Sequence, residues 1–112
     1  MDESAFVFVY STFPDEASAK RIAEALVTAK LAACVNIHGP MTSVYSWEGK
    51  LESGSEFAAF IKTRKVLVPA VMETARPLHP YTVPCFLELP IASGNEDYLA
   101  WAREQTLGPR GP

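Results

Sequence analysis

The chain has 112 residues, of which 48% are apolar and 21% charged, a composition typical of one compact globular domain and not of a disordered chain. Its net charge of -3, without a basic stripe, makes nucleic acid and anionic membranes unexpected partners. No apolar run approaches the roughly 18 to 20 residues of a membrane span, and the acidic N-terminus differs from a secretory signal. Two cysteines, Cys34 and Cys85, are too few for a disulfide framework, which favours reduced thiols in the cytoplasm.

A strand followed by a helix is predicted at the start of the chain. Residues 4–12, SAFVFVYST, are rich in valine and phenylalanine, which favours a buried strand ended by Pro14. Residues 15–30 then follow a helical period, with small or apolar side chains at spacings of three and four. These side chains are Ala19, Ile22, Ala23, Leu26 and Ala29. Acidic residues at the start of this helix and Lys30 at its end suit the helix dipole.

The middle of the chain predicts a strand and a β-hairpin. Residues 31–38, LAACVNIH, have strand composition and are interrupted by Gly39 and Pro40. Two further strand-like runs, residues 42–50 and 51–63, surround a turn in which Gly49 permits the positive φ of a tight hairpin. These runs carry more large apolar side chains than one helix-covered face needs, which predicts pairing between subunits.

A second helix, a strand and a third helix are predicted in the last part. Residues 66–78 have one apolar helical face, and Pro77 and Pro80 are expected to end this helix because each disfavours the α conformation of the residue before it. A strand is predicted for TVPCFLELPI, residues 82–91, and a closing helix led by Asn95 for residues 95–105. Residues 107–112 have nothing to pack and are expected to form a flexible tail.

The predicted order is β-α-β-β-α-β followed by a C-terminal helix. This order is the split βαβ arrangement called ferredoxin-like, an α+β fold in which helices cover one face of an antiparallel sheet. We therefore expect one domain over residues 1–106. Because this fold supports many functions, the order of elements alone predicts none of them.

Six separated stretches resemble the CutA family, the divalent-cation tolerance proteins. They are STFPDE at 11–16, KLAACVNI at 30–37, VYSWEGKLE at 44–52, IKT at 61–63, HPYTVP at 79–84 and YLAW at 98–101. The resemblance extends from about residue 6 to residue 104 with the right order and spacing. It implies a ferredoxin-like fold, a tight homotrimer, a cytoplasmic location in bacteria, no established catalytic reaction and binding of divalent cations such as copper. It also implies an architecture similar to that of PII-type signalling proteins, which are trimers with clefts between subunits.

The resemblance also points to candidate metal ligands. His79 matches the histidine beside which metal ligation has been placed in the family, and Cys85 stands where many members carry a glutamate. Ser11 stands where some members carry a cysteine. A thiolate favours softer ions, so we predict weak, surface-accessible binding of copper or zinc at His79, with Cys85 contributing where its thiol faces a cleft. An extended chain would separate the two residues by about 20 Å, so a shared ion requires a fold-back or a neighbouring subunit.

Structural roles are also open for these residues. A histidine at the end of a helix is more often a capping or exposed residue than a ligand, and a free cysteine in an apolar strand is commonly a small buried hydrophobe. Cys34 and His38 would lie roughly 13 Å apart along a strand, too far to share one ion. Trp47 is expected to lock the hairpin and its contacts with a neighbouring subunit.

No catalytic motif is recognisable in the sequence. The nucleophile elbow G-x-S-x-G, the P-loop and G-x-G-x-x-G are absent, and two isolated histidines offer no triad, so we do not expect an enzyme. Glu56 and Lys62 lie six residues apart on one face of a strand. They could form an ion pair across subunits or in a cleft, but a solvated pair is favoured. Two function classes stay open: a metal-binding homeostasis protein and a trimeric ligand-sensing module of PII-like architecture.

Overall fold

The computed structural model describes residues 5–108, which form an α+β fold with one four-stranded antiparallel sheet. The strands are β1 (Phe6–Phe13), β2 (Cys34–Trp47), β3 (Lys50–Arg64) and β4 (Leu87–Pro90), and their order in the sheet is β2-β3-β1-β4. The helices are α1 (Glu16–Thr28), α2 (Val68–Ala75) and α3 (Glu96–Gln105). Two short 3₁₀ turns, Lys65–Leu67 and Arg76–Leu78, flank α2.

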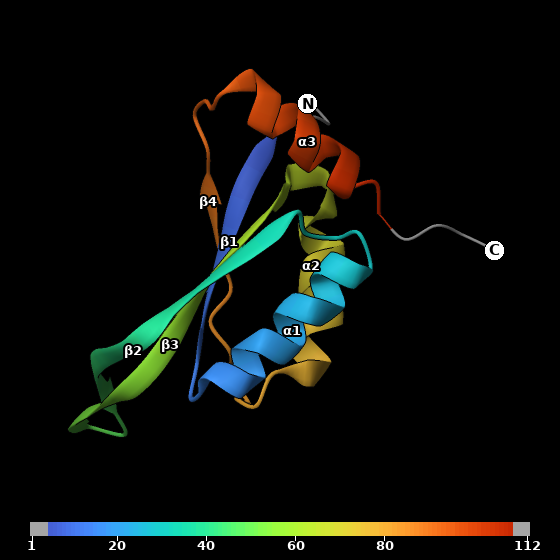
Figure 1. Cartoon of the computed structure of the whole chain (residues 1–112). Coiled ribbons are helices and arrows are strands. Elements are labelled where there is room, and N and C mark those ends of the chain that lie inside the picture. Colours follow the sequence, from blue (N-terminus) through green and yellow to red (C-terminus); the bar gives the residue numbers. More distant parts are fainter. Residues whose placement is uncertain (1–4, 109–112) are drawn as a thin grey trace.

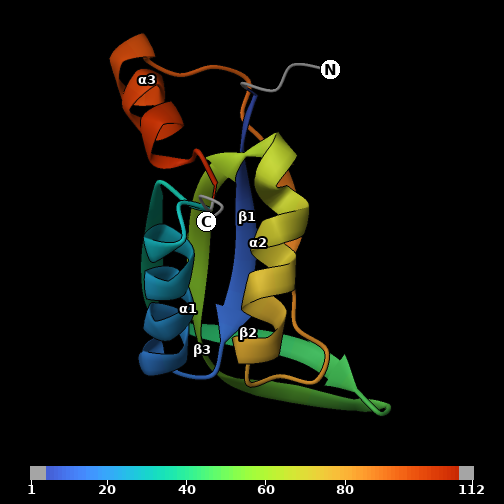
Figure 2. The same cartoon turned by 90° about the vertical axis from the view of Figure 1, so that its right-hand side faces the viewer.

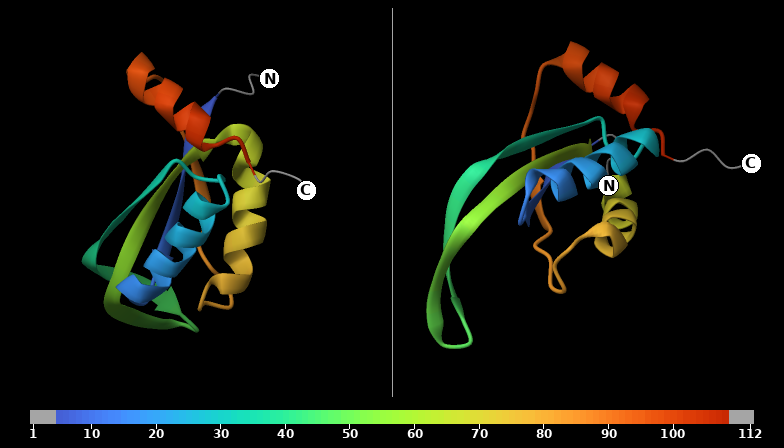
Figure 3. Two further views of the ribbon diagram at one scale, coloured as in Figure 1. Left: turned by 45° about the vertical axis from the view of Figure 1, so that its right-hand side comes forward. Right: turned by 60° about the horizontal axis from the view of Figure 1, so that its bottom comes forward.

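The core lies between the sheet and the pair of helices α1 and α2, which cover one face of the sheet (Figures 1 and 2). Alternation along β1 produces this arrangement, because residues of odd number from Val7 to Phe13 are buried and those of even number are half-buried. Ile22 and Leu26 of α1 and Val71 of α2 meet the buried side of the sheet. Helix α3 lies at the end of the sheet remote from the hairpin tip (Figure 3).

The first helix begins where its sequence predicts. Asp15 is the N-cap, and its Oδ1 atom accepts hydrogen bonds from the Ser18 hydroxyl at 2.6 Å and from the Ser18 N–H at 2.7 Å. These two bonds, the hydroxyl bond first, lower the pKa of Asp15. The helix ends at Thr28, two residues before the predicted end, and Lys30 has a positive φ that turns the chain toward β2.

Two expectations about the second half of the chain are wrong. Pro77 does not end the helical segment: Arg76 keeps the α conformation, and Pro77 lies in the first turn of a 3₁₀ helix, where its missing N–H needs no partner. Pro80 does end it, since His79 before it is extended. The last strand is also shorter than expected, because residues 81–86 leave the sheet and only Leu87–Pro90 pair with β1.

The β2–β3 hairpin is longer and more continuous than predicted. Gly39 and Pro40 do not end β2 but lie in a register shift between His38 and Met41, and pairing with β3 resumes from Met41 to Trp47. The outer part of the hairpin projects well beyond the helices (Figures 1 and 3), and several of its large apolar side chains are exposed. Val44 is 64% exposed, Trp47 61% and Leu51 81%.

The predicted tail only partly falls within the described residues. The Gly108 N–H donates to the Lys30 carbonyl at 3.0 Å, and Leu107 is exposed. Residues 109–112 of the predicted tail, and residues 1–4 of the predicted domain, lie outside the described part. None of the helices found between residues 5 and 108 has the length and apolar character needed to cross a membrane.

The register shift in β2 requires glycine at position 39. A Cβ atom at Gly39 would meet the Phe57 ring, lying only 2.7 Å from its Cγ atom. We expect Gly39→Ala to lower the free energy of unfolding by about 1–3 kcal/mol, the usual cost of overpacking, as measured by urea denaturation at fixed protein concentration. Gly54→Ala is the matched control on the partner strand, since nothing lies within 4 Å of its added methyl group. Equal effects of the two substitutions would contradict this explanation.

Candidate ligand-binding cleft

His79 is a buried residue that joins the segment after α2 to strand β1. Its side chain packs among three aromatic rings: it stacks on Phe13 at 4.6 Å between ring centroids and meets Phe86 edge to face at 5.7 Å. The Tyr81 ring lies 5.2 Å away. Only 7% of His79 is exposed, so the exposed histidine considered for this helix end does not occur.

Both ring nitrogens of His79 have protein partners. Nε2 lies 2.9 Å from the Thr12 carbonyl oxygen, and the Tyr81 backbone N–H donates to Nδ1 at 3.1 Å. Because a carbonyl only accepts and a backbone N–H only donates, the ring must be neutral and protonated at Nε2. Ser11 Oγ lies a longer 3.4 Å from the same Nε2. A metal ion at either nitrogen would have to replace one of the two hydrogen bonds.

The electrostatic surroundings of His79 agree with a neutral ring. Burial lowers the pKa of His79, against smaller opposing effects of the Thr12 hydrogen bond and the Glu56 charge. The unfolded chain therefore binds a proton at this residue more readily than the folded chain does. His79 thus stabilises the fold fully above about pH 6.5, and this contribution is lost as the pH falls through the lower pKa of the folded state.

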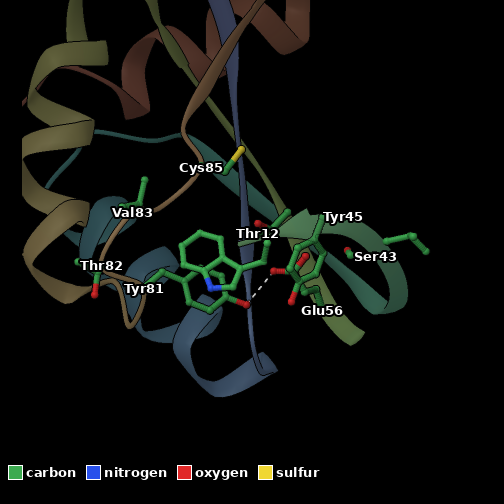
Figure 4. A pocket seen from close by; sticks show the side chains of 10 residues that line it. Thr12, Ser43, Tyr45, Glu56, Tyr81, Thr82, Val83 and Cys85 are labelled. Carbon is green, nitrogen blue, oxygen red and sulfur yellow. Dashed lines mark hydrogen bonds between the residues drawn. The ribbon is translucent and has the colours of Figure 1, made fainter. Parts of the chain in front are cut away.

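Tyr81 connects His79 to Glu56 on strand β3. The Tyr81 hydroxyl donates to Glu56 Oε2 at 2.7 Å, shown as a dashed line in Figure 4. Burial, followed by this hydrogen bond, raises the pKa of Tyr81 well above its ordinary value, so the phenol remains a donor. His79 therefore positions the Tyr81 backbone, and Tyr81 in turn positions the Glu56 carboxylate.

Glu56 forms one wall of an open cleft of about 690 Å³ between the outer part of the hairpin and the segment before β4. The cleft is lined by Thr12 of β1, by Ser43, Val44, Tyr45 and Trp47 of β2, by Glu56 of β3, and by Tyr81, Thr82, Val83 and Cys85 of the segment before β4. In Figure 4, Tyr81 points toward Glu56 and Cys85 lies apart from both. The lining has one carboxylate and no lysine, arginine or histidine, so the cleft is electronegative.

The two predicted metal ligands occupy different environments. Cys85 lines the cleft and is half-buried, whereas His79 lies behind the cleft in the aromatic cluster. Among the interactions found within residues 5–108, none joins His79 to Cys85. Burial, and after it the Glu56 charge, raises the pKa of the Cys85 thiol, so this thiol is protonated at neutral pH.

A closed metal site is not formed within this part of the chain. No group of three or more histidine, cysteine, aspartate or glutamate side chains in residues 5–108 has an arrangement that holds a metal ion. A structural zinc site requires about four such ligands. The residues therefore do not fit a resident metal held by one chain.

Sequence reasoning missed the pairing of Glu56 with Tyr81. Glu56 and Lys62 form no ion pair within residues 5–108: the Lys62 ammonium lies over the Tyr98 ring, 5.5 Å from its centroid. Within residues 5–108 the single ion pair joins Lys65 to Glu88. Glu56 and Tyr81 are separated by 25 residues, so only their positions in the fold bring them together. No pattern in the sequence indicates this contact.

A family model, related sequences and solved structures all relate this chain to the same family. The family model described as CutA1 divalent ion tolerance protein matches residues 7–105. The divalent-cation tolerance protein CutA of Thermus thermophilus is 47% identical over 98 residues, which are 88% of this chain and 95% of that protein. A solved structure of divalent cation tolerance protein (Cut A1) from Thermus thermophilus has a TM-score of 0.87 at 46% identity, covering 90% of this chain and 98% of that one. Protein CutA 1, chloroplastic, of Oryza sativa is 43% identical over 89% of this chain, which spans only 56% of that relative.

Proposed function

Because the chain belongs to the CutA1 divalent ion tolerance family, we propose that it is a trimeric, non-catalytic protein of divalent-ion tolerance that binds copper or zinc weakly. The observation that carries this proposal is the family match over residues 7–105. The Thermus thermophilus relative is called a divalent-cation tolerance protein, and the sequence lacks the nucleophile and phosphate-binding motifs considered earlier, which supports a role in binding.

The layout of the sheet supports the proposed ferredoxin-like architecture and trimer. The order β2-β3-β1-β4 joins the two β-α-β units through central strands β1 and β3, as expected for the split arrangement. Strands β2 and β4 are sheet edges with unpaired backbone groups, and edges of this kind favour pairing with another chain. The exposed apolar side chains of the hairpin would be covered by such pairing.

We expect a stable trimer at micromolar concentration, because association buries the hairpin. Analytical ultracentrifugation and native mass spectrometry measure the oligomeric state directly, and a stable monomer would contradict the proposal.

Trp47→Ala should lower the unfolding temperature more than Trp101→Ala, since Trp47 lies on the projecting hairpin and Trp101 on α3. That temperature should rise with protein concentration in the wild type, because folding and association are linked.

The metal ion of this proposal is cargo and not a resident cofactor. Cys85 supports such binding, because its half-buried thiol lines the open cleft and a neutral thiol at this position can exchange its proton for a soft ion. The Glu56 carboxylate supplies negative charge nearby. His79 can join the site only by giving up the hydrogen bond to Thr12 or Tyr81, so we propose Cys85 as the first ligand.

Zinc titrations under reducing conditions test this assignment. Cys85→Ser should weaken zinc binding at least about tenfold, and Cys34→Ser, the same change at the other half-buried cysteine, should leave it unchanged. Affinity in the wild type should rise by up to about tenfold per pH unit from pH 6 to 8, since the raised pKa of Cys85 means that binding releases a proton. If Cys85→Ser binds zinc as tightly as the wild type, Cys85 is not a ligand. A comparable loss in His79→Gln would make His79 a ligand as well.

The cleft itself favours a second candidate function, a PII-like module that senses a small ligand. Its volume of about 690 Å³ lies in the usual range of roughly 300–1,000 Å³ for small-molecule sites. Most of its lining is aromatic or small and polar, which is the composition of an organic ligand site more than of a metal site. For either function we propose the cytoplasm as the location, where Cys34 and Cys85 remain free thiols.

A further inference from the structure

The sheet has two apolar faces, and the helices α1 and α2 cover only one of them. In β1 the buried side chains of Val7 and Val9 alternate with the aromatic side chains of Phe8 and Tyr10, which are half-buried. Successive side chains of a strand point to opposite faces, so Phe8 and Tyr10 lie on the face away from the helices (Figure 2). A solvated face of an antiparallel sheet normally carries polar residues. The composition of β1 is therefore that of a strand covered on both sides.

The side chains of this second face, here called the open face, form two rows across all four strands. Cross-strand partners share a face, so the register of the sheet places them together. The eight side chains are Phe8 and Tyr10 of β1, Cys34 and Asn36 of β2, Phe60 and Lys62 of β3, and Leu87 and Leu89 of β4. The Phe60 ring lies 6.0 Å from Phe8 and 5.2 Å from Tyr10 between centroids. Most of the open face is thus one continuous apolar surface.

The open face carries almost no charge. None of its eight side chains is a carboxylate, although the chain has 13 aspartate and glutamate residues. Its one cation, Lys62, has its ammonium over the Tyr98 ring of α3, 5.5 Å from the centroid. In a cyclic assembly a side chain near the axis meets its own copies, so an uncompensated charge there would repel itself. The open face avoids this repulsion and suits association with copies of itself.

We propose that the open face is the interior of the trimer, where it packs against the open faces of two further copies of this chain. This inference rests on the trimer proposed above and names the surface that holds it together. Because α1 and α2 cover the other face, only the open face is free to turn inwards. The strand edges β2 and β4 border the open face. Pairing of β4 in one chain with β2 in the next would curve three sheets around a common interior.

Other occupants would need features that the open face lacks. An anionic membrane attracts clusters of lysine and arginine, whereas the open face has one lysine that already contacts an aromatic ring. A small-molecule site needs a concave pocket with several convergent polar groups. The cleft described above includes none of the eight side chains, so the open face is a separate surface.

Two substitutions of exposed aliphatic side chains by glutamate test the inference. Leu89→Glu changes the open face, and Val27→Glu changes the outer surface of α1, where the wild-type side chain has the same exposed fraction of 41%. Both side chains are exposed in the single chain, so neither change should prevent folding, which circular dichroism checks. In analytical ultracentrifugation Leu89→Glu should raise the concentration at which the trimer dissociates at least about a hundredfold, because its carboxylate would be buried without a cation. Val27→Glu should dissociate as the wild type does.

The thiol of Cys34 gives a second readout, since it belongs to the open face. In Cys85→Ser protein it is the one remaining thiol of the chain. Maleimide labelling of Cys34 should be at least about tenfold slower in the trimer of this protein than in the same protein carrying Leu89→Glu, because the interior is closed to the reagent. If Leu89→Glu does not fold, Leu87→Glu, at a side chain that is 58% exposed, replaces it in both experiments.

The outcomes separate this inference from the trimer on which it depends. A wild-type chain that is monomeric contradicts both. A stable trimer that tolerates Leu89→Glu as well as Val27→Glu overturns the inference but leaves an assembly held by the hairpin and the strand edges. The same conclusion follows if Cys34 in the trimer reacts as fast as in the dissociated chain, since the open face would then be accessible to another partner.

Discussion

Two hydrogen bonds of one imidazole hold the part of the molecule on which the cleft depends. His79 donates to the Thr12 carbonyl in β1 and accepts from the Tyr81 N–H, which fastens the segment after α2 to the sheet. Tyr81 is thereby placed where its hydroxyl reaches Glu56 on β3. Three segments that are distant in sequence meet through this chain of contacts. Loss of the ring would leave a carbonyl and an N–H without partners, at about 1–3 kcal/mol for each buried group.

The sequence predicts most of the fold because the secondary structure follows local rules. Helix α1 is set by its apolar spacing and by the Asp15 cap, and the hairpin turn by Gly49, both of which depend only on neighbouring residues. The errors occur where tertiary contacts override local preference. Pro77 fits the first turn of a 3₁₀ helix, and the strand β2 continues through Gly39 because this residue makes room for Phe57. The segment before β4 leaves the sheet to build the cleft wall.

The candidate site is less predictable, since it is made by residues that are distant in sequence. Family resemblance singled out His79 and Cys85, and these two residues lie on either side of the cleft wall: one is enclosed by aromatic rings and the other faces the opening. The sequence contains no mark that Tyr81 rather than Lys62 meets Glu56, because that contact depends on where the loop after α2 returns to the sheet. The residues that line the cleft, and hence its negative charge, can be identified only when the pairing of the strands is known.

The tautomer and pKa of His79 test this account most directly, because the hydrogen bonds that position Tyr81 and Glu56 begin at that ring. Nitrogen NMR of the imidazole reports which nitrogen carries the proton and follows its titration in the native protein. We expect a neutral ring protonated at Nε2, still neutral when the pH falls through about 6.5, where an ordinary histidine gains its proton. A ring protonated at Nδ1, or a pKa of His79 at or above the ordinary value, would contradict the proposed positioning of Tyr81 and Glu56.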